Sequence, residues 1–208
     1  MNPGQLVNIF VVLFVVIDPL GTASIFAVLT RGMTVQQRRG VALRGVLIAA
    51  FILVVFGLIG RTLLQLLGIG MPAFRLAGGI LLFMLAIDMV LARQSGLRGA
   101  TPAERSEAIR RDDISVFPLA FPLLAGPGAL TILLILMGSG PPGIRFALIL
   151  GLLLLVLALT LAALILAPRL MRLLGETGTN VVDRLLGVIL AALAMQFVID
   201  GLRAVLAG

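Results

Sequence analysis

Six runs of apolar residues alternate along the chain with shorter polar, Gly-rich or Pro-rich connectors. The runs cover about residues 5–29, 43–67, 71–92, 115–138, 144–167 and 181–206. Each is long enough to cross a bilayer, because a membrane-spanning helix needs about 20 apolar residues. Within the hydrocarbon, a helix also satisfies its own backbone hydrogen bonds. The pattern therefore predicts an all-α, polytopic membrane protein with six transmembrane helices.

The connector over residues 93–114 is much longer than the others and divides the runs into two groups of three. Its charged residues have mixed sign: Arg93, Arg98, Arg105, Arg110, Arg111, Glu104, Glu107, Asp112 and Asp113. We interpret it as a solvated cytoplasmic hinge within one integral membrane domain, residues 1–208. Repeat 1 covers about 1–92 and repeat 2 about 115–208.

Short similarities between the two halves suggest an internal duplication. The matching segments are RLAGGILL at 75–82 with RLLGVILA at 184–191, IDPLG at 17–21 with AGPGA at 125–129, and LLQLLG at 63–68 with LMRLLG at 170–175. A nearly constant offset favours a repeat. Because each unit has three spans, the copies would cross the membrane in opposite directions, as inverted repeats of many secondary transporters do. The alternative is chance matching in a chain rich in Leu, Gly and Ala.

The composition agrees with this fold class and narrows the chemistry. Apolar residues make up 61% of the 208 residues and charged residues 12%, whereas soluble domains average about 45–50% and 25%. The chain has no Cys and no His, which excludes disulfides, thiolate or imidazole catalysis, and Cys or His metal sites. No hydrolase or nucleotide-binding motif occurs. We therefore expect no enzyme, no cofactor and no metal.

The charge distribution indicates orientation in a bilayer. All 16 basic residues are arginines, set against 9 acidic residues, for a net charge of +7. They lie singly or in pairs between apolar runs, without interleaved aromatics, so we expect no nucleic acid partner. Twelve lie in or beside the odd-numbered connectors and four elsewhere. The positive-inside rule therefore predicts cytoplasmic odd connectors and both termini on the periplasmic, outer side.

Asp18 is the most informative polar residue because it lies near the middle of the first run. A carboxylate there costs about 2.5–3.5 kcal/mol on insertion scales, so it is a functional hypothesis by default. Pro19 removes a backbone donor and Gly21 loosens the same turn. We expect the first transmembrane helix to be broken or kinked here, with its freed backbone groups buried in protein or facing a wet cavity.

The fourth run has a matching interruption. Pro118 and Pro122 precede Gly126, Pro127 and Gly128, so the fourth helix is also expected to be broken or kinked. Paired interruptions in inverted halves are a pointer to a transport site. If each break starts a half-helix, the N–H groups that follow would form two positive dipole ends near the midplane, suited to a carboxylate. The alternative is that both are kinks that shape helix packing.

Other polar residues near the breaks or span ends have two readings each. Thr22, Ser24 and Thr131 can add hydrogen bonds to a ligand, or each hydroxyl can bond a carbonyl of its own helix. Asp88 and Gln196 are candidates for an ion or proton relay with Asp18, as is Asp200. The alternatives are that Asp88 and Asp200 reach the interface or pair with Arg93 and Arg203, and that Gln196 bridges helices.

With these residues identified, the chain resembles the MarC family of bacterial inner-membrane proteins, also described as a neutral amino acid transporter family. The resemblance covers essentially the full length. It rests on IDPLG at 17–21, FPLLAGPGALT at 121–131, and RLxGxIL at 75–81 and again at 184–190. Members often have Asn-x-Pro after DPxG, where this chain has Thr22 and Ser24.

The resemblance implies an inner-membrane transporter of small neutral amino acids. The paired breaks add the expectation of a secondary transporter with a midplane site between the repeats, and the absence of an ATP-binding motif favours coupling to an ion such as H⁺ or Na⁺, or facilitated movement. The candidate substrate-binding residues are Asp18, Pro19, Gly21, Thr22, Gly126, Pro127, Gly128 and Thr131. The candidate relay residues are Asp18, Asp88 and Gln196. Two alternatives remain, a non-transporting regulatory or interaction protein and an exporter of other small molecules. The oligomeric state is open.

Overall fold

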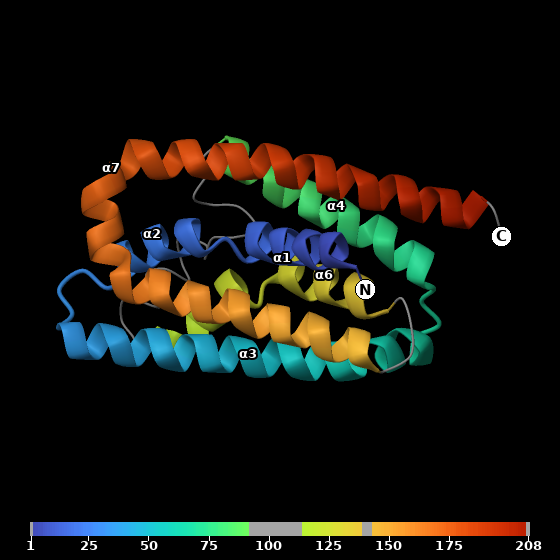
Figure 1. Cartoon of the computed structure of the whole chain (residues 1–208), viewed down its shortest axis with the longest axis horizontal. Coiled ribbons are helices and arrows are strands. Elements are labelled where there is room, and N and C mark those ends of the chain that lie inside the picture. The colour runs from blue at the N-terminus through green and yellow to red at the C-terminus, as the bar shows by residue number, and fades with distance from the viewer. Residues whose placement is uncertain (1, 92–113, 139–142, 207–208) are drawn as a thin grey trace.

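The structure is a computed structural model that describes residues 2–91, 114–138 and 143–206. The described residues form helical elements joined by short connections: α1 (Pro3–Ile17), α2 (Pro19–Leu29), α3 (Val35–Leu66), α4 (Met71–Val90), η1 (Ser115–Leu124), α6 (Pro127–Met137) and α7 (Ile144–Leu206). Figure 1 shows an elongated bundle in which both termini lie toward the same end. The charged hinge expected over 93–114 lies almost wholly outside the described residues.

The helices match the six predicted runs. Five stretches are long and apolar enough to cross a membrane: Pro3–Leu29, Val35–Leu66, Met71–Val90, Ile144–Gly175 and Thr177–Leu206. The pair η1 and α6 together forms a sixth, bent by 52°. The prediction of an all-α membrane protein is therefore confirmed for the described residues. The inverted arrangement of two repeats stays a prediction at this point.

Two connectors are partly helical. Helix α3 begins at Val35, well before the apolar run, because Thr34 and Gln37 form a capping box. The Gln37 N–H donates to Thr34 Oγ1 (3.3 Å) and the Thr34 N–H donates to Gln37 Oε1 (2.9 Å). These bonds satisfy two backbone donors at the helix start. The polar first turns of α3 therefore extend the helix beyond its apolar part.

The connector over 168–180 is also helical, except at Gly175. Gly175 has φ 65° and ψ 178°, a backbone conformation that glycine adopts without the steric penalty of a side chain. Here α7 changes direction (Figure 1), so that it consists of a first limb, Ile144–Gly175, and a second limb, Thr177–Leu206. One long element therefore supplies two of the candidate spans.

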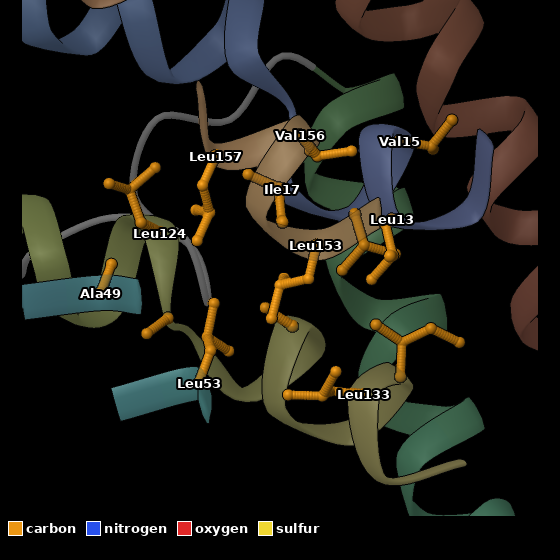
Figure 2. Close-up of a cluster of buried hydrophobic side chains, with 14 of the residues drawn as sticks. Leu13, Val15, Ile17, Ala49, Leu53, Leu124, Leu133, Leu153, Val156 and Leu157 are labelled. Atoms are coloured by element: carbon orange, nitrogen blue, oxygen red, sulfur yellow. The ribbon is translucent and has the colours of Figure 1, made fainter. Parts of the chain in front are cut away.

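The core joins helices from both halves of the sequence. Figure 2 shows buried apolar side chains that converge from α1, α3, the end of η1, α6 and the first limb of α7: Leu13, Ile17, Leu53, Leu124, Leu133, Leu153 and Leu157. Lipid tails are as apolar as leucine, so helices in a bilayer associate through close packing more than through exclusion of water. Close packing of this kind favours small residues such as glycine where two helices meet.

Three glycines bring α6 close to its neighbours. A β-carbon placed on Gly57 or Gly60 of α3 would overlap Met137 or Leu134 of α6, and one on Gly78 of α4 would overlap Thr131. The missing side chains therefore leave recesses filled by α6. We refer to Gly57, Gly60 and Gly78 as the glycine sockets. They fix α6 between α3 and α4.

Candidate functional site

Asp18 forms the junction between α1 and α2. It has a left-handed conformation, φ 49° and ψ 76°, which Asp tolerates better than most residues. Its N–H donates to the Phe14 carbonyl (2.9 Å), and its Oδ1 accepts from the Gly21 N–H (3.1 Å). Asp18 is fully buried. One residue thus closes the end of α1 and caps the start of α2, which Pro19 begins.

The hydroxyls beside this break bond to their own chain. Thr22 donates to the Ile17 carbonyl (3.2 Å), across the break, and Ser24 donates to the Gly21 carbonyl (2.7 Å). The N-terminus of α2 already holds a carboxylate, that of Asp18. A ligand carboxylate at this half-helix end would compete with that cap. The start of α6, which has no side-chain cap, is therefore the better candidate for binding a ligand carboxylate.

The second break lies at Ala125 and Gly126, between η1 and α6. Irregular backbone precedes it, because Phe117 and Phe121 have extended conformations inside η1. Gly126 precedes α6 without any side-chain cap, and Pro127 has no N–H to donate. The first intrahelical donor is Leu130, whose N–H bonds to the Gly126 carbonyl (3.0 Å). The N–H groups of Gly128 and Ala129 come before it, in the first turn, where helices bind anions.

Gly126 is the residue that permits this turn. A β-carbon at this position would overlap the carbonyl oxygen of Pro122, which is backbone and cannot rotate away. Its own φ of −72° and ψ of 174° are open to any residue, so close approach and not conformation requires glycine. The first glycine of the Gly-Pro-Gly sequence is therefore required by the close approach of the Pro122 carbonyl.

A small cavity links the second break to the end of α1. Its volume is about 20 Å³, enough for roughly one water molecule. The lining residues are Val16, Leu81, Leu85, Pro122, Leu123, Gly126, Pro127, Gly128 and Ala129. A β-carbon on Gly128 would lie 3.5 Å from Val16 Cγ1, so the two interruptions are neighbours inside the bundle. The cavity is too small for an amino acid.

The structure also places a carboxylate beside Asp18 that the sequence reasoning did not single out. A β-carbon on Gly21 would overlap the Asp18 carboxylate and lie 3.1 Å from Asp183 Oδ1. Asp183 comes from the second limb of α7 and is half-buried. In the sequence, Asp183 stands next to Arg184 near the start of the last run, which is the pattern of an acid at the membrane interface. Its position within the predicted sixth span was the one sequence feature that could have marked it as a candidate.

The remaining candidates lie in different surroundings. Thr131 is buried and packs into the socket of Gly78, one turn beyond the cavity. Asp88 is half-buried near the end of α4. Gln196 is exposed on α7, where its Nε2 donates to Asp200 Oδ1 (2.8 Å). Gln196 and Asp200 therefore form a pair on an outer face and are not among the residues that line the cavity.

The chain was compared with known protein families. The family described as "MarC family integral membrane protein" matches residues 4–206, nearly the whole chain. The chain belongs to the MarC family. The sequence resemblance is thus confirmed, and this MarC family member is an integral, multi-pass membrane protein. No solved structure matches it.

Curated relatives of this MarC family member come from bacteria and archaea. The UPF0056 membrane protein MJ1677 of Methanocaldococcus jannaschii is 35% identical over 93% of this chain and 94% of its own length. YvbG of Bacillus subtilis, also called a membrane protein, is 34% identical over 95% and 94%. The inner membrane protein YhgN of Escherichia coli is 33% identical over 96% and 97%. These names state a membrane location and no substrate.

Proposed function

We propose that this MarC family protein is a secondary transporter of small neutral amino acids, with its site at the cavity between the two helix breaks. The observation that carries the proposal is the proximity of the two interruptions: Gly128 follows one, and a β-carbon on it would lie 3.5 Å from Cγ1 of Val16, two residues before the other. Backbone donors at membrane depth are tolerated where protein buries them or where they line a cavity. A purely structural bundle does not require two such breaks side by side.

The chemistry of the cavity favours a small zwitterion. The N–H groups of Gly128 and Ala129, at the positive end of α6, are suited to a substrate carboxylate. The walls contributed by Val16, Leu81 and Leu85 are apolar and suit a hydrogen atom or a methyl group, as in glycine or alanine. Asp18 does not line the cavity; in this proposal it carries a coupling H⁺ or Na⁺, or meets the ammonium group once the cavity has opened. Asp88 is a second relay candidate, whereas Gln196 is exposed and bonded to Asp200 and has no relay role in this proposal.

The element boundaries support two repeats. Helices α2 and α6 each have 11 residues and start at Pro19 and Pro127, 108 positions apart. Helix α3 and the first limb of α7 each have 32 residues and start at Val35 and Ile144, 109 positions apart. These offsets match those of the short sequence similarities. We infer that the two halves share one three-span plan.

Helix directions support an inverted relation of the halves. A β-carbon on Gly79 of α4 would approach Val198 in the second limb of α7, and one on Gly187 of that limb would approach Met89. The contact partners move backward along one helix as they move forward along the other, so the two helices are antiparallel. Third and sixth spans related by a two-fold axis in the membrane plane would show this pattern.

We also propose an inner-membrane location with both termini on the outer side. The bundle end opposite the termini carries the polar start of α3 and the α7 turn (Figure 1), with the described arginines Arg31, Arg38, Arg39, Arg44, Arg169, Arg172 and Arg184. The terminal end carries Arg61, Arg75, Arg145 and Arg203. The richer end would face the cytoplasm.

Counterflow of labelled alanine in proteoliposomes tests the function. We expect uptake above that of empty vesicles, and loss of uptake in Gly128→Ala, whose added methyl would lie 3.0 Å from Leu85 Cδ2 and 3.5 Å from Val16 Cγ1 and fill the cavity. The matched control is Gly151→Ala, because nothing lies within 4 Å of a β-carbon at Gly151. Absence of flux for alanine and for a panel of other small solutes would refute the transport proposal.

A further inference from the structure

The two helix breaks are held together in different ways. At the first, Asp18 caps α2 through its carboxylate, and the Thr22 hydroxyl bonds back across the break to Ile17. At the second, Gly126 offers no side chain to cap α6, and Pro127 has no N–H. Side-chain caps restrain the conformation at a helix start. The second break is therefore the easier of the two to bend.

Helix α6, which follows the second break, is retained by packing into the glycine sockets. A β-carbon on Gly57 would lie 2.7 Å from Met137 Sδ and 3.2 Å from Leu133 Cδ2. One on Gly60 would overlap Leu134 Cδ2, and one on Gly78 would overlap Thr131 Cγ2. In the native chain the side chains of Met137, Leu134 and Thr131 occupy the space that these β-carbons would take, so the socket contacts themselves are packing contacts. Packing contacts of this kind can break and re-form when α6 moves away from α3 and α4.

The position of α6 gives this difference a consequence. Its first turn lines the cavity, and its last residues lie toward the bundle end that carries both termini (Figure 1). It therefore runs from the cavity toward that end, packed among α1, α3 and α4. Movement of α6 out of the sockets would open the cavity in that direction.

We propose that α6 is the gate of the cavity on the side of the termini, hinged at Ala125 and Gly126 and held closed by the glycine sockets. The inference rests on the proposed transport function, because a gate needs a path to close. In this scheme α2 stays fixed while α6 moves, because the hydrogen bonds of Asp18 and Thr22 restrain the start of α2. The two half-helices thus have different roles despite their equal length.

Thiol accessibility tests the gate without any substrate. The chain has no cysteine, so Ala129→Cys provides a single reporter on the cavity wall, and Ala49→Cys provides a second, fully buried on α3. Each is combined with Gly60→Val, which fills a socket against Leu134, or with the control Gly151→Val, which points into open space. An impermeant methanethiosulfonate reagent is added to vesicles sorted by orientation through a terminal tag.

We expect Gly60→Val to raise the reaction rate of Ala129→Cys from the terminal side at least about tenfold, because overpacking the socket disfavours the closed position of α6. Gly151→Val should leave the rate unchanged. The double variant Gly60→Val with Leu134→Ala shortens the α6 side chain that enters this socket, and it should restore the protection of Ala129→Cys from the reagent. If Gly60→Val does not fold, Gly60→Ala, with one added methyl, should give the same effect at smaller size.

Three results would overturn the gate: no rise at Ala129→Cys, a rise only from the side opposite the termini, or an equal rise at Ala49→Cys, which reports general loosening. These outcomes are separable from failure of the transport proposal. A socket-dependent rise without alanine flux supports the gate and removes the substrate assignment. Flux without a socket-dependent rise keeps transport and removes α6 as the gate.

Discussion

Replacement of Asp18 separates its structural role from its proposed role in transport. The carboxylate accepts the Gly21 N–H while the backbone holds a left-handed conformation at φ 49°. Asp18→Asn keeps an acceptor oxygen and a residue type that tolerates this conformation. Asp18→Gly loses the acceptor but relaxes the backbone. Asp18→Ala loses the acceptor and keeps a β-carbon in the unfavourable conformation.

The magnitudes follow from these differences. Loss of an N-cap side chain to Ala costs about 0.5–2 kcal/mol, and a left-handed conformation costs an ordinary residue about 1–2 kcal/mol. We expect Asp18→Ala to lower the free energy of unfolding by about 2–3 kcal/mol, Asp18→Gly by about 1 kcal/mol, and Asp18→Asn by less than about 1 kcal/mol. Alanine counterflow should nevertheless fall strongly in Asp18→Asn, because the charge is lost.

Reversible unfolding in mixed micelles, followed by far-ultraviolet circular dichroism, measures these stabilities; the chain has neither Trp nor Tyr for intrinsic fluorescence. Equal destabilisation by Asn and Ala would refute the capping argument. Full transport activity in Asp18→Asn at unchanged stability would remove the carboxylate charge from the mechanism. The two readouts therefore test the two roles independently.

Further predictions concern the second break, the outer face and the orientation. Gly126→Ala should lower the free energy of unfolding by about 1–3 kcal/mol, because its methyl meets a backbone carbonyl. Gly151→Ala should change this free energy by less than about 1 kcal/mol. Thermal unfolding of the two variants compares these effects. Gln196→Leu should leave counterflow unchanged, because this side chain lies on an exposed face; lost flux at normal stability would place it in the path. Impermeant reagents should label Asn2→Cys from the outer side and Thr34→Cys from the cytoplasmic side, and the reverse pattern, or labelling of both from one side, would contradict the proposed orientation.

The helices were predictable because hydropathy is a local property. The sixth run gave one span, and the fourth gave a bent pair at the place where Gly126 and Pro127 interrupt it. The start of α3 at Val35 was also encoded locally, since Thr34 followed three residues later by Gln37 is a capping-box pattern. Hydropathy alone does not report this polar first turn, because it lies outside the apolar run.

The candidate site was predictable only in its local parts. Asp18 before Pro19 is a helix-start pattern, which explains why the carboxylate caps its own half-helix. The approach of Asp183 to Gly21 joins residues far apart in sequence, and no periodicity reports such a contact. The asymmetry between a capped and an uncapped break likewise appeared only from the hydrogen bonds.

Ligand-dependent thermal stabilisation in detergent tests the central claim, a small-molecule site at the cavity between the breaks, most directly. A ligand that binds the folded state raises its apparent stability with concentration. We predict that alanine or glycine raises the melting temperature of the wild-type protein and of Gly151→Ala, and leaves that of Gly128→Ala unchanged. No shift with any small solute of a broad panel, or an equal shift in Gly128→Ala, would contradict the account.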